Sequence, residues 1–255
     1  MSMLHISIAA EKLFEIFGMA ITNTLLMSWI TSVFLIAGAV FLYRRTAKIP
    51  LTFQNIFESA VEWMLGMMEG IFGSREKAEK YFPIIATIFI FILISNWLGI
   101  LPGIGSVGFL EPAMGIHEED GHGVTRFIPL FRSSASDLNF TLALAITAVL
   151  LVNIMGVRAT GFGAHMRKFF TLKSPVDFFV GILEFIAEFA KIVSFSFRLF
   201  GNVFAGEVLL AITAFLVPFF IPVPFLMLEV FVGFIQALVF SMLTMVFISL
   251  AVQHH

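Results

Sequence analysis

The sequence predicts an all-α polytopic membrane protein with five membrane-spanning helices and one amphipathic surface helix. Hydrophobic residues make up 59% of the 255 residues, and the mean hydropathy is +1.00. Five apolar runs are long enough to cross a hydrocarbon core of about 30 Å. Little chain remains between these runs, so a single membrane domain over 1–255 is expected. The predicted spans are 25–43, 82–101, 138–157, 176–217 and 225–252, and the predicted amphipathic helix is 51–73.

Composition also excludes several classes of function. The chain has no cysteine, which rules out disulfides, thiolate metal sites and thiol catalysis. It lacks the Walker A pattern GxxxxGK[ST], so no nucleotide site, cofactor or catalytic site is expected in this chain. His117 and His122 stand among acidic residues of a loop, but without rigid ligand spacing a solvated loop is favoured over a metal site. Nothing in the sequence suggests nucleic-acid binding.

Basic residues set the expected orientation. Arg44, Arg45 and Lys48 follow the first span at once and should be cytoplasmic. Six basic residues lie in 44–80 and four in 158–175, against three in all outer segments. The N-terminus is therefore expected outside and the C-terminus in the cytoplasm. The absence of a basic leader or a presequence favours a bacterial plasma (inner) membrane over an organelle inner membrane.

The segments outside the spans differ in character. Residues 1–20 mix charged and apolar residues and are expected at the membrane interface. In the amphipathic helix, Glu58, Glu62 and Glu69 share one face, opposite apolar side chains. We expect a charged turn over 74–80 and an outer loop, rich in Gly and Pro, over 102–136.

The stretch 176–217 is unusual because it is both very apolar and charged. As one helix its 42 residues would be ~63 Å long, so it must tilt strongly or break. The three prolines of 218–224 then turn the chain into the last helix, which makes an antiparallel hairpin. A charge at the bilayer centre costs about 2.5–3.5 kcal/mol, so charged groups there must face protein or water. Besides Asp177 at its start, the ionisable residues of the stretch are Glu184, Glu188, Lys191, Arg198 and Glu207.

Helical periodicity orders these polar groups. At ~100° per residue, Asn202 and all of the charged residues except Glu207 fall on one face. On the last helix, Glu229 and Gln236 are seven apart and share a face. Glu229 and Glu207 both lie near the outer turn. Arg198 therefore stands between outer acids and two inner acids, Glu184 and Glu188, which is typical of an ion or proton path. A buried salt-bridge cluster that only holds the bundle together is the structural alternative.

The chemistry of arginine shapes the predicted path. Arginine is not deprotonated in proteins, so Arg198 cannot relay a proton. The sequence thus predicts two aqueous half-paths separated by a fixed positive charge. A proton would have to leave on a carrier and return on the other side, and a partner could supply that carrier carboxylate.

The run SFRLFGNVFAGE over 196–207 closely resembles the signature of subunit a of F-type ATP synthases. The segments 22–25, 96–102, 132–145 and 236–240 also resemble this family. The resemblance implies a stator subunit of the membrane sector that faces a rotating ring of c subunits, with b-type peripheral stalk subunits and the lipid bilayer as further partners. It implies the essential arginine at Arg198 and an inner exit position at Glu184. It also implies an outer half-channel formed by Asn202, Glu207, Glu229 and Gln236.

Some roles stay open at this stage. Glu188 is placed in the inner half-channel by periodicity alone. Lys191 matches a basic position of the family, but it can equally serve to balance Glu184 or Glu188. Some family members have histidine in the outer pair, whereas this chain has glutamate at both positions. Two close carboxylates titrate as a coupled pair, so one of them is expected to be protonated at neutral pH. The expected ion is H+, with Na+ open because the deciding residues belong mainly to the ring.

Two rival hypotheses make different predictions. A self-contained secondary transporter or channel predicts an internal repeat and broken helices that meet at mid-membrane, and the sequence shows no convincing repeat. A structural scaffold predicts that Arg198→Ala leaves transport intact.

Overall fold

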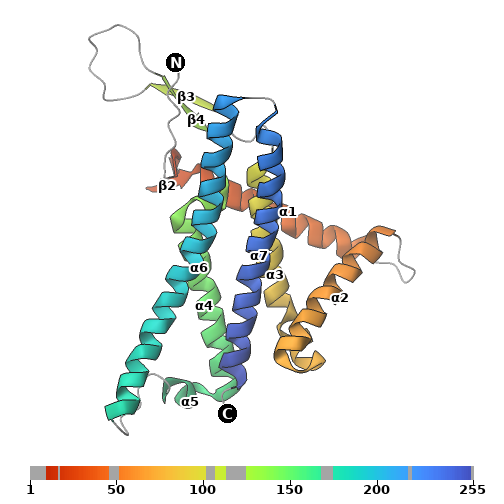
Figure 1. Cartoon of the computed structure of the whole chain (residues 1–255), viewed down its shortest axis with the longest axis vertical. Helices are drawn as coiled ribbons and strands as arrows, with labels where there is room; N and C mark the ends of the chain where they lie inside the picture. The colour runs from red at the N-terminus through yellow and green to blue at the C-terminus, as the bar shows by residue number, and fades with distance from the viewer. Residues whose placement is uncertain are drawn as a thin grey trace.

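The computed structural model describes residues 10–16, 18–45, 52–101, 107–112, 125–167, 175–217 and 220–253. Helices α3, α4, α6 and α7 form a bundle (Figure 1). Helix α1 crosses this bundle at a large angle, and α2 packs against α3. His117, His122, Lys48, Lys168 and Lys173, which the sequence analysis considered, lie outside the described residues. The helices are α1 (Asn23–Arg45), α2 (Thr52–Phe72), α3 (Arg75–Ile100), α4 (Leu138–Thr160), α5 (Phe162–Arg167), α6 (Pro175–Leu216) and α7 (Pro222–Gln253).

The fold class is confirmed. Helices α1, α3, α4, α6 and α7 are each long and apolar enough to cross a membrane. Helix α2 is the amphipathic helix and buries Met64, Leu65, Met68 and Phe72 against α3 and α7. Helix α6 is a single unbroken helix of 42 residues, which leaves a strong tilt as the way to fit it into a bilayer.

Two short antiparallel hairpins were not predicted. Strands β1 (Lys12–Ile16) and β2 (Met19–Thr22) pair across a turn in which Gly18 has a φ of 78°, a conformation that glycine adopts readily. Strands β3 (Gly108–Pro112) and β4 (Thr125–Pro129) pair within the predicted outer loop. These segments are too short to show clear alternation of apolar and polar residues, so no strand could be predicted there.

The predicted charged turn over 74–80 is wrong, because α3 begins at Arg75. Ser74 caps the helix, and its hydroxyl accepts a hydrogen bond from the Lys77 backbone N–H at 3.2 Å. Such a cap satisfies a backbone donor that the first helical turn leaves free. The charged residues are therefore the polar first turns of a spanning helix.

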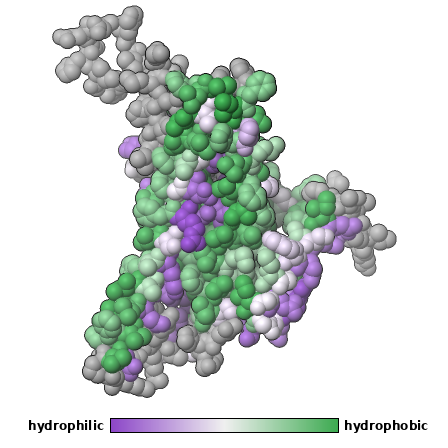
Figure 2. Space-filling view, in the orientation of Figure 1, coloured by the Kyte–Doolittle hydropathy of each residue, from purple (hydrophilic) through white to green (hydrophobic). Residues whose placement is uncertain are grey.

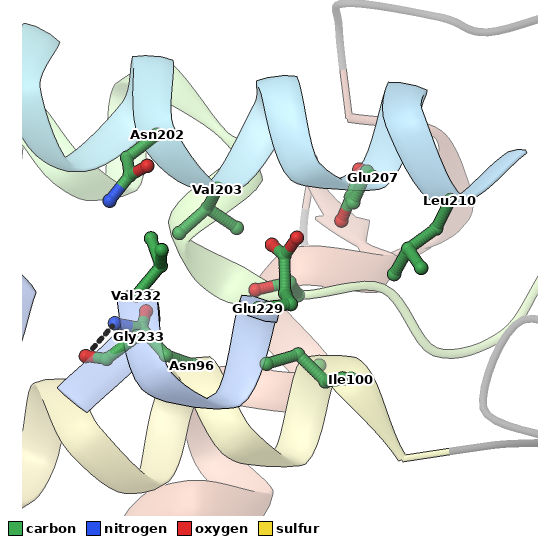
Figure 3. A pocket seen from close by; sticks show the side chains of 11 residues that line it. Asn96, Ile100, Asn202, Val203, Glu207, Leu210, Glu229, Val232 and Gly233 are labelled. Carbon is green, nitrogen blue, oxygen red and sulfur yellow. Dashed lines mark hydrogen bonds between the residues drawn. The ribbon is translucent and has the colours of Figure 1, made fainter. Parts of the chain in front are cut away.

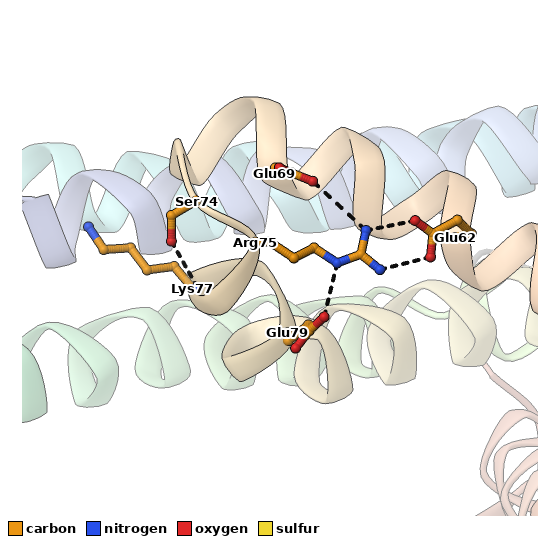
Figure 4. Close-up of polar contacts among 6 residues, drawn as sticks. All are labelled: Glu62, Glu69, Ser74, Arg75, Lys77 and Glu79. Carbon is orange, nitrogen blue, oxygen red and sulfur yellow. Dashed lines mark hydrogen bonds and ion pairs between the residues drawn. The ribbon is translucent and has the colours of Figure 1, made fainter.

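Arg75, the first residue of α3, connects α3 to α2 through an ion pair (Figure 4). Its guanidinium donates to both carboxylate oxygens of Glu62 at 2.7 and 2.8 Å and to Glu79 at 3.0 Å. Glu69 lies 3.8 Å away. The hydrogen bonds from Arg75 hold the pKa of Glu62 below its usual value. The acidic face of the amphipathic helix thus contributes directly to the α2–α3 connection.

The centre of the bundle is packed from small and aromatic residues. Ala145 of α4 and Ala237 of α7 are fully buried, which allows the helices to approach closely. Phe195 of α6 packs against Phe240 of α7 with ring centroids 4.5 Å apart and the ring planes inclined at 46°. Leu199, one turn beyond Phe195, is also fully buried. This packing fixes which face of α6 is left for the polar residues.

Asp137 connects α1 to the start of α4. As the N-cap of α4 it accepts from the Asn139 backbone N–H at 2.9 Å and from the Thr24 hydroxyl at 3.0 Å. We expect Asp137→Ala to destabilise the protein by about 1–3 kcal/mol through the lost cap and buried hydrogen bond. Thermal unfolding of the detergent-solubilised protein would measure this. Asp177→Ala, which removes an exposed acid from the first turn of α6, should change the midpoint much less, and equal effects would contradict the prediction.

Candidate ion-path site between α6 and α7

The candidate site follows the contact between α6 and α7. The C-terminal end of α6 lies beside the N-terminal end of α7, and the two helices diverge toward their other ends (Figure 1). Figure 2 shows a hydrophilic area in the middle of this face, bordered by hydrophobic surface on both sides. Polar groups midway along membrane-spanning helices are unusual, because an apolar surface is expected there.

Arg198 lies at the exposed surface of α6 and lines an open cavity of about 310 Å³. Ala187, Ala190 and Ser194 precede it on the same helical face, and their small side chains leave room in front of the guanidinium. Within the part of the chain that the structure describes, no hydrogen bond or ion pair engages the Arg198 side chain. Its donors are therefore available to an anion from outside the chain. The other lining residues are Lys191, Phe195, Leu243 and Phe247.

A second, smaller cavity lies toward the α6–α7 turn (Figure 3). Its volume of about 20 Å³ is enough for roughly one water molecule. Asn202 on α6 donates to the Gln236 side-chain oxygen on α7 at 3.3 Å, next to this cavity. The lining residues are Asn96, Gly99, Ile100, Ser133, Asn202, Val203, Glu207, Leu210, Glu229, Val232 and Gly233.

The two predicted outer acids meet at this cavity. Figure 3 shows the Glu207 and Glu229 carboxylates converging on it from α6 and α7. The Glu229 carboxylate lies directly against Gly206, where a Cβ atom would overlap it. Glycine at 206 therefore allows the α7 carboxylate to reach the α6 backbone.

Arg132 is a site residue that the sequence analysis missed. It precedes the short 3-10 helix η2 (Ser134–Ser136), and its guanidinium donates to the Glu207 carboxylate at 3.1 and 3.2 Å. The side chains of Arg132 and Glu207 are 12% and 26% exposed, so this is a largely buried ion pair. In the sequence, Arg132 only begins the 132–145 segment that resembles the family.

Asn96 links α3 to the same cavity. Its side-chain amide donates to the Gly233 carbonyl at 3.2 Å, while its side-chain oxygen is buried without a hydrogen-bond partner in the structure. The Ser133 hydroxyl, which also lines the cavity, is likewise buried and without a partner there. Buried polar atoms of this kind are commonly satisfied by water, and one water fits here. In the sequence, Asn96 only begins the 96–102 segment that resembles the family.

The inner residues form a separate group. Lys191 donates to Glu188 at 2.7 Å, and their side chains are 23% and 15% exposed. The sequence left open which acid balances Lys191, and the structure assigns Glu188. Asn153 of α4 donates to the other Glu188 oxygen at 3.3 Å. Glu184, one turn earlier on α6, is half-buried and lines neither of the two cavities described above.

The structure thus places the predicted residues in an inner and an outer group along α6, with Arg198 between them. The outer group also includes Glu229 and Gln236 of α7. Glu188 is ~15 Å and Glu207 ~13 Å from Arg198 along the helix axis at about 1.5 Å per residue. The partners from other elements were not predicted as site residues, since periodicity within one helix says nothing about which distant segment packs against it. They are Asn96, Arg132, Ser133 and Asn153.

The fold and the site define a multi-pass membrane protein that carries ionisable groups inside its helix bundle. The family model of the ATP synthase A chain matches residues 25–249. The chain belongs to this family, F-type ATP synthase subunit a, which confirms the resemblance found in the sequence. Membership supports a role in proton transport and ATP synthesis within the membrane sector of a multi-subunit complex.

Individual relatives agree with the family assignment. The chain is 33% identical over 244 residues to ATP synthase subunit a of Moorella thermoacetica, covering 96% of this chain and 97% of the relative. It is 33% identical over 233 residues to the Gloeobacter violaceus protein of the same name, covering 91% and 85%. A Helicobacter pylori ATP synthase subunit a is 32% identical over 234 residues, covering 88% and 90%. These relatives are bacterial, in agreement with a multi-pass bacterial membrane protein.

Proposed function

We propose that this chain translocates protons through two offset half-channels at its interface with a rotating c-ring and so couples the proton-motive force to ATP synthesis. The observation that carries the proposal is the position of Arg198. Its guanidinium faces an open cavity without a partner among the described residues, and a polar group lies on each side of it along α6. Such a guanidinium can bind a carboxylate that a neighbouring subunit supplies.

In the outer half-channel, protons would move along the polar groups around the small cavity. Asn202, Glu207, Glu229 and Gln236 would carry them, with the Glu207–Glu229 pair sharing a proton at neutral pH. The buried Asn96 and Ser133 atoms would hold a water that connects this pair to the interior. The inner half-channel would run past Glu184, Glu188 and Lys191 to the cytoplasm.

Arg198 would separate the two half-channels. Because arginine keeps its proton, it blocks direct transfer between them. A ring carboxylate protonated from the outer side leaves into the lipid as a neutral group. It returns after rotation and releases its proton on the inner side. Arg198 then attracts the ionised carboxylate until the outer half-channel protonates it again. The proton is conserved throughout, and no covalent bond of the protein changes.

The setting of this mechanism is a bacterial plasma membrane, with the N-terminus outside and the C-terminus in the cytoplasm. Helix α6 is too long to stand along the membrane normal, and α1 crosses the bundle steeply (Figure 1). A strongly tilted bundle presents a long side of α6 to a ring. We further propose that b-type peripheral stalk subunits hold this chain as part of the stator. The nucleotide chemistry would occur on partner subunits, with no catalytic site in this chain.

The rival transporter hypothesis fits the structure less well. Transporters with inverted repeats place broken helices at mid-membrane, whereas α6 continues unbroken through its polar residues. A scaffold fits less well too, because a purely structural arginine would be expected to have a partner within the chain.

A disulfide test addresses the partner directly, and the absence of cysteine in this chain makes it specific. Ser194→Cys, in the cavity beside Arg198, should cross-link to a cysteine placed next to the ring carboxylate in the intact complex. The cross-link should stop ATP-driven proton pumping, and a reductant should restore it. Phe34→Cys, 57% exposed on α1, is the control that should not cross-link. Equal cross-linking at both positions, or none at Ser194→Cys, would overturn the proposed interface.

A further inference from the structure

A chain of buried polar side chains connects α5 to the inner group. His165 of α5 is only 7% exposed, and its Nε2 lies 3.0 Å from the Asn153 side-chain oxygen. The Asn153 amide in turn donates to Glu188 at 3.3 Å, and Lys191 donates to the other Glu188 oxygen at 2.7 Å. Four residues from three helices are thus connected in series.

The hydrogen-bond chemistry fixes the orientation of Asn153. Its amide nitrogen donates to the Val149 carbonyl at 2.9 Å and to Glu188, and both groups face it as acceptors. A flipped amide would place the Asn153 oxygen against these two acceptors. The oxygen must therefore face His165, and His165 must donate through Nε2–H. The Nε2–H of His165 thus donates the hydrogen bond that the Asn153 side-chain oxygen accepts.

The backbone of α4 is shaped to receive the imidazole. A Cβ atom at Gly156 would lie 2.9 Å from the His165 Cε1 and 3.1 Å from its Nδ1, which is closer than van der Waals contact allows. Gly156 is an interior helical residue, where glycine normally costs about 0.5–1 kcal/mol relative to alanine. The close contact with the imidazole provides a reason for glycine at this position.

We propose that His165 is a positioning residue of the inner half-channel, which acts through Asn153 to hold Glu188 against Lys191. The inference rests on the proposed function of the chain. The Lys191 ammonium lies 4.7 Å from the Phe247 ring centre at the wall of the Arg198 cavity. With Glu188 fixed, the charge of Lys191 stays compensated at the inner end of that cavity. If Glu188 were released, the Lys191 ammonium would be free to compete with Arg198 for the ring carboxylate.

The first test compares His165→Met with His165→Gln in the intact ATP synthase complex in inverted membrane vesicles. Methionine fills the space without a donor, whereas glutamine places an N–H near the position of Nε2. We expect His165→Met to reduce ATP-driven proton pumping about three- to tenfold, the effect of one lost hydrogen bond. His165→Gln should stay close to the native rate. An equal loss in both variants would overturn the proposal.

A second measurement does not depend on activity. Amine-reactive labelling followed by peptide mass spectrometry should show Lys191 modified about three- to tenfold faster in His165→Met than in the native complex. The exposed Lys77 on α3 should be labelled equally in both. Equal increases at Lys191 and Lys77 would indicate a general loosening of the complex and would overturn the proposal. Unchanged labelling of Lys191 would overturn the proposal.

Gly156→Ala provides an independent variant, because its Cβ would displace the imidazole without changing a polar group; its next contact is Ala251 Cβ at 3.2 Å. It should reproduce the effects of His165→Met. The matched control is Gly38→Ala on α1, where a Cβ meets nothing within 4 Å, and it should behave as native. Native behaviour of Gly156→Ala would count against the proposal. Arg198→Ala separates the two levels of inference: if it pumps normally the proposed function fails, whereas if it loses pumping while His165→Met is native only the role of His165 fails.

Discussion

Replacing Arg198 with alanine should abolish ATP-driven proton pumping while passive proton flux through the membrane sector stays or rises. In the proposed mechanism, Arg198→Ala removes the cation that attracts the ionised ring carboxylate and the charge that separates the two half-channels. Losing one partner of a desolvated charge pair costs about 2–5 kcal/mol, so the pumping rate should fall at least about thirtyfold. Both fluxes can be measured with a pH-sensitive dye in vesicles that hold the complex.

Two further variants make the Arg198 experiment specific. Arg198→Lys keeps the positive charge but lacks the planar fork that binds a carboxylate through two parallel hydrogen bonds. The Arg198→Lys variant should therefore keep passive proton flux low, but its ATP-driven proton pumping should be slow. Arg158→Ala removes an exposed arginine of α4 and should leave both fluxes unchanged. Unchanged coupled pumping in Arg198→Ala would mean that Arg198 has only a structural role, and the two-half-channel proposal would have to be abandoned.

Most of the helices could be predicted because each spanning segment is a long apolar run between charged or proline-rich segments. The 42-residue length of α6 followed directly from the absence of a helix breaker between Pro175 and Pro218. The start of α3 was predicted wrongly because the charged segment 74–80 resembles a turn in composition. Its actual structure depends on the Ser74 cap and on Arg75 contacting Glu62, which lies 13 residues earlier in the chain.

The site residues also divide into those that the sequence of one helix predicts and those that depend on packing between segments. Residues on one helix were predictable, since periodicity places Arg198 and Asn202 on a common face. The meeting of Glu229 and Glu207 at one cavity could be anticipated in outline, because both lie near one turn. Arg132 and His165 could not be connected to the site in this way. Arg132 contacts Glu207 of α6 from the segment before η2, and His165 contacts Asn153 of α4 from α5. Only the packing of the bundle decides which of these polar groups meet.

Arg132→Ala should destabilise the outer site more than any exposed substitution. The Arg132–Glu207 pair is largely buried, with side chains 12% and 26% exposed. Removing one partner of a buried pair leaves an uncompensated charge and costs about 3–5 kcal/mol. We expect a lower thermal midpoint for the solubilised complex, less of this chain assembled in the membrane, and loss of ATP-driven pumping. Arg75→Ala, which breaks an exposed ion pair, should change the midpoint far less.

A double variant separates the structural role of the pair from its role in proton transfer. Removing both charges together leaves no uncompensated buried charge, so Arg132→Gln with Glu207→Gln should restore assembly and the thermal midpoint. It should not restore pumping, because glutamine cannot exchange protons at position 207. If the double variant is as unstable as Arg132→Ala, the ion pair is not what stabilises the outer site. If it pumps at the native rate, Glu207 carries no proton, and the outer half-channel must run through Glu229 alone.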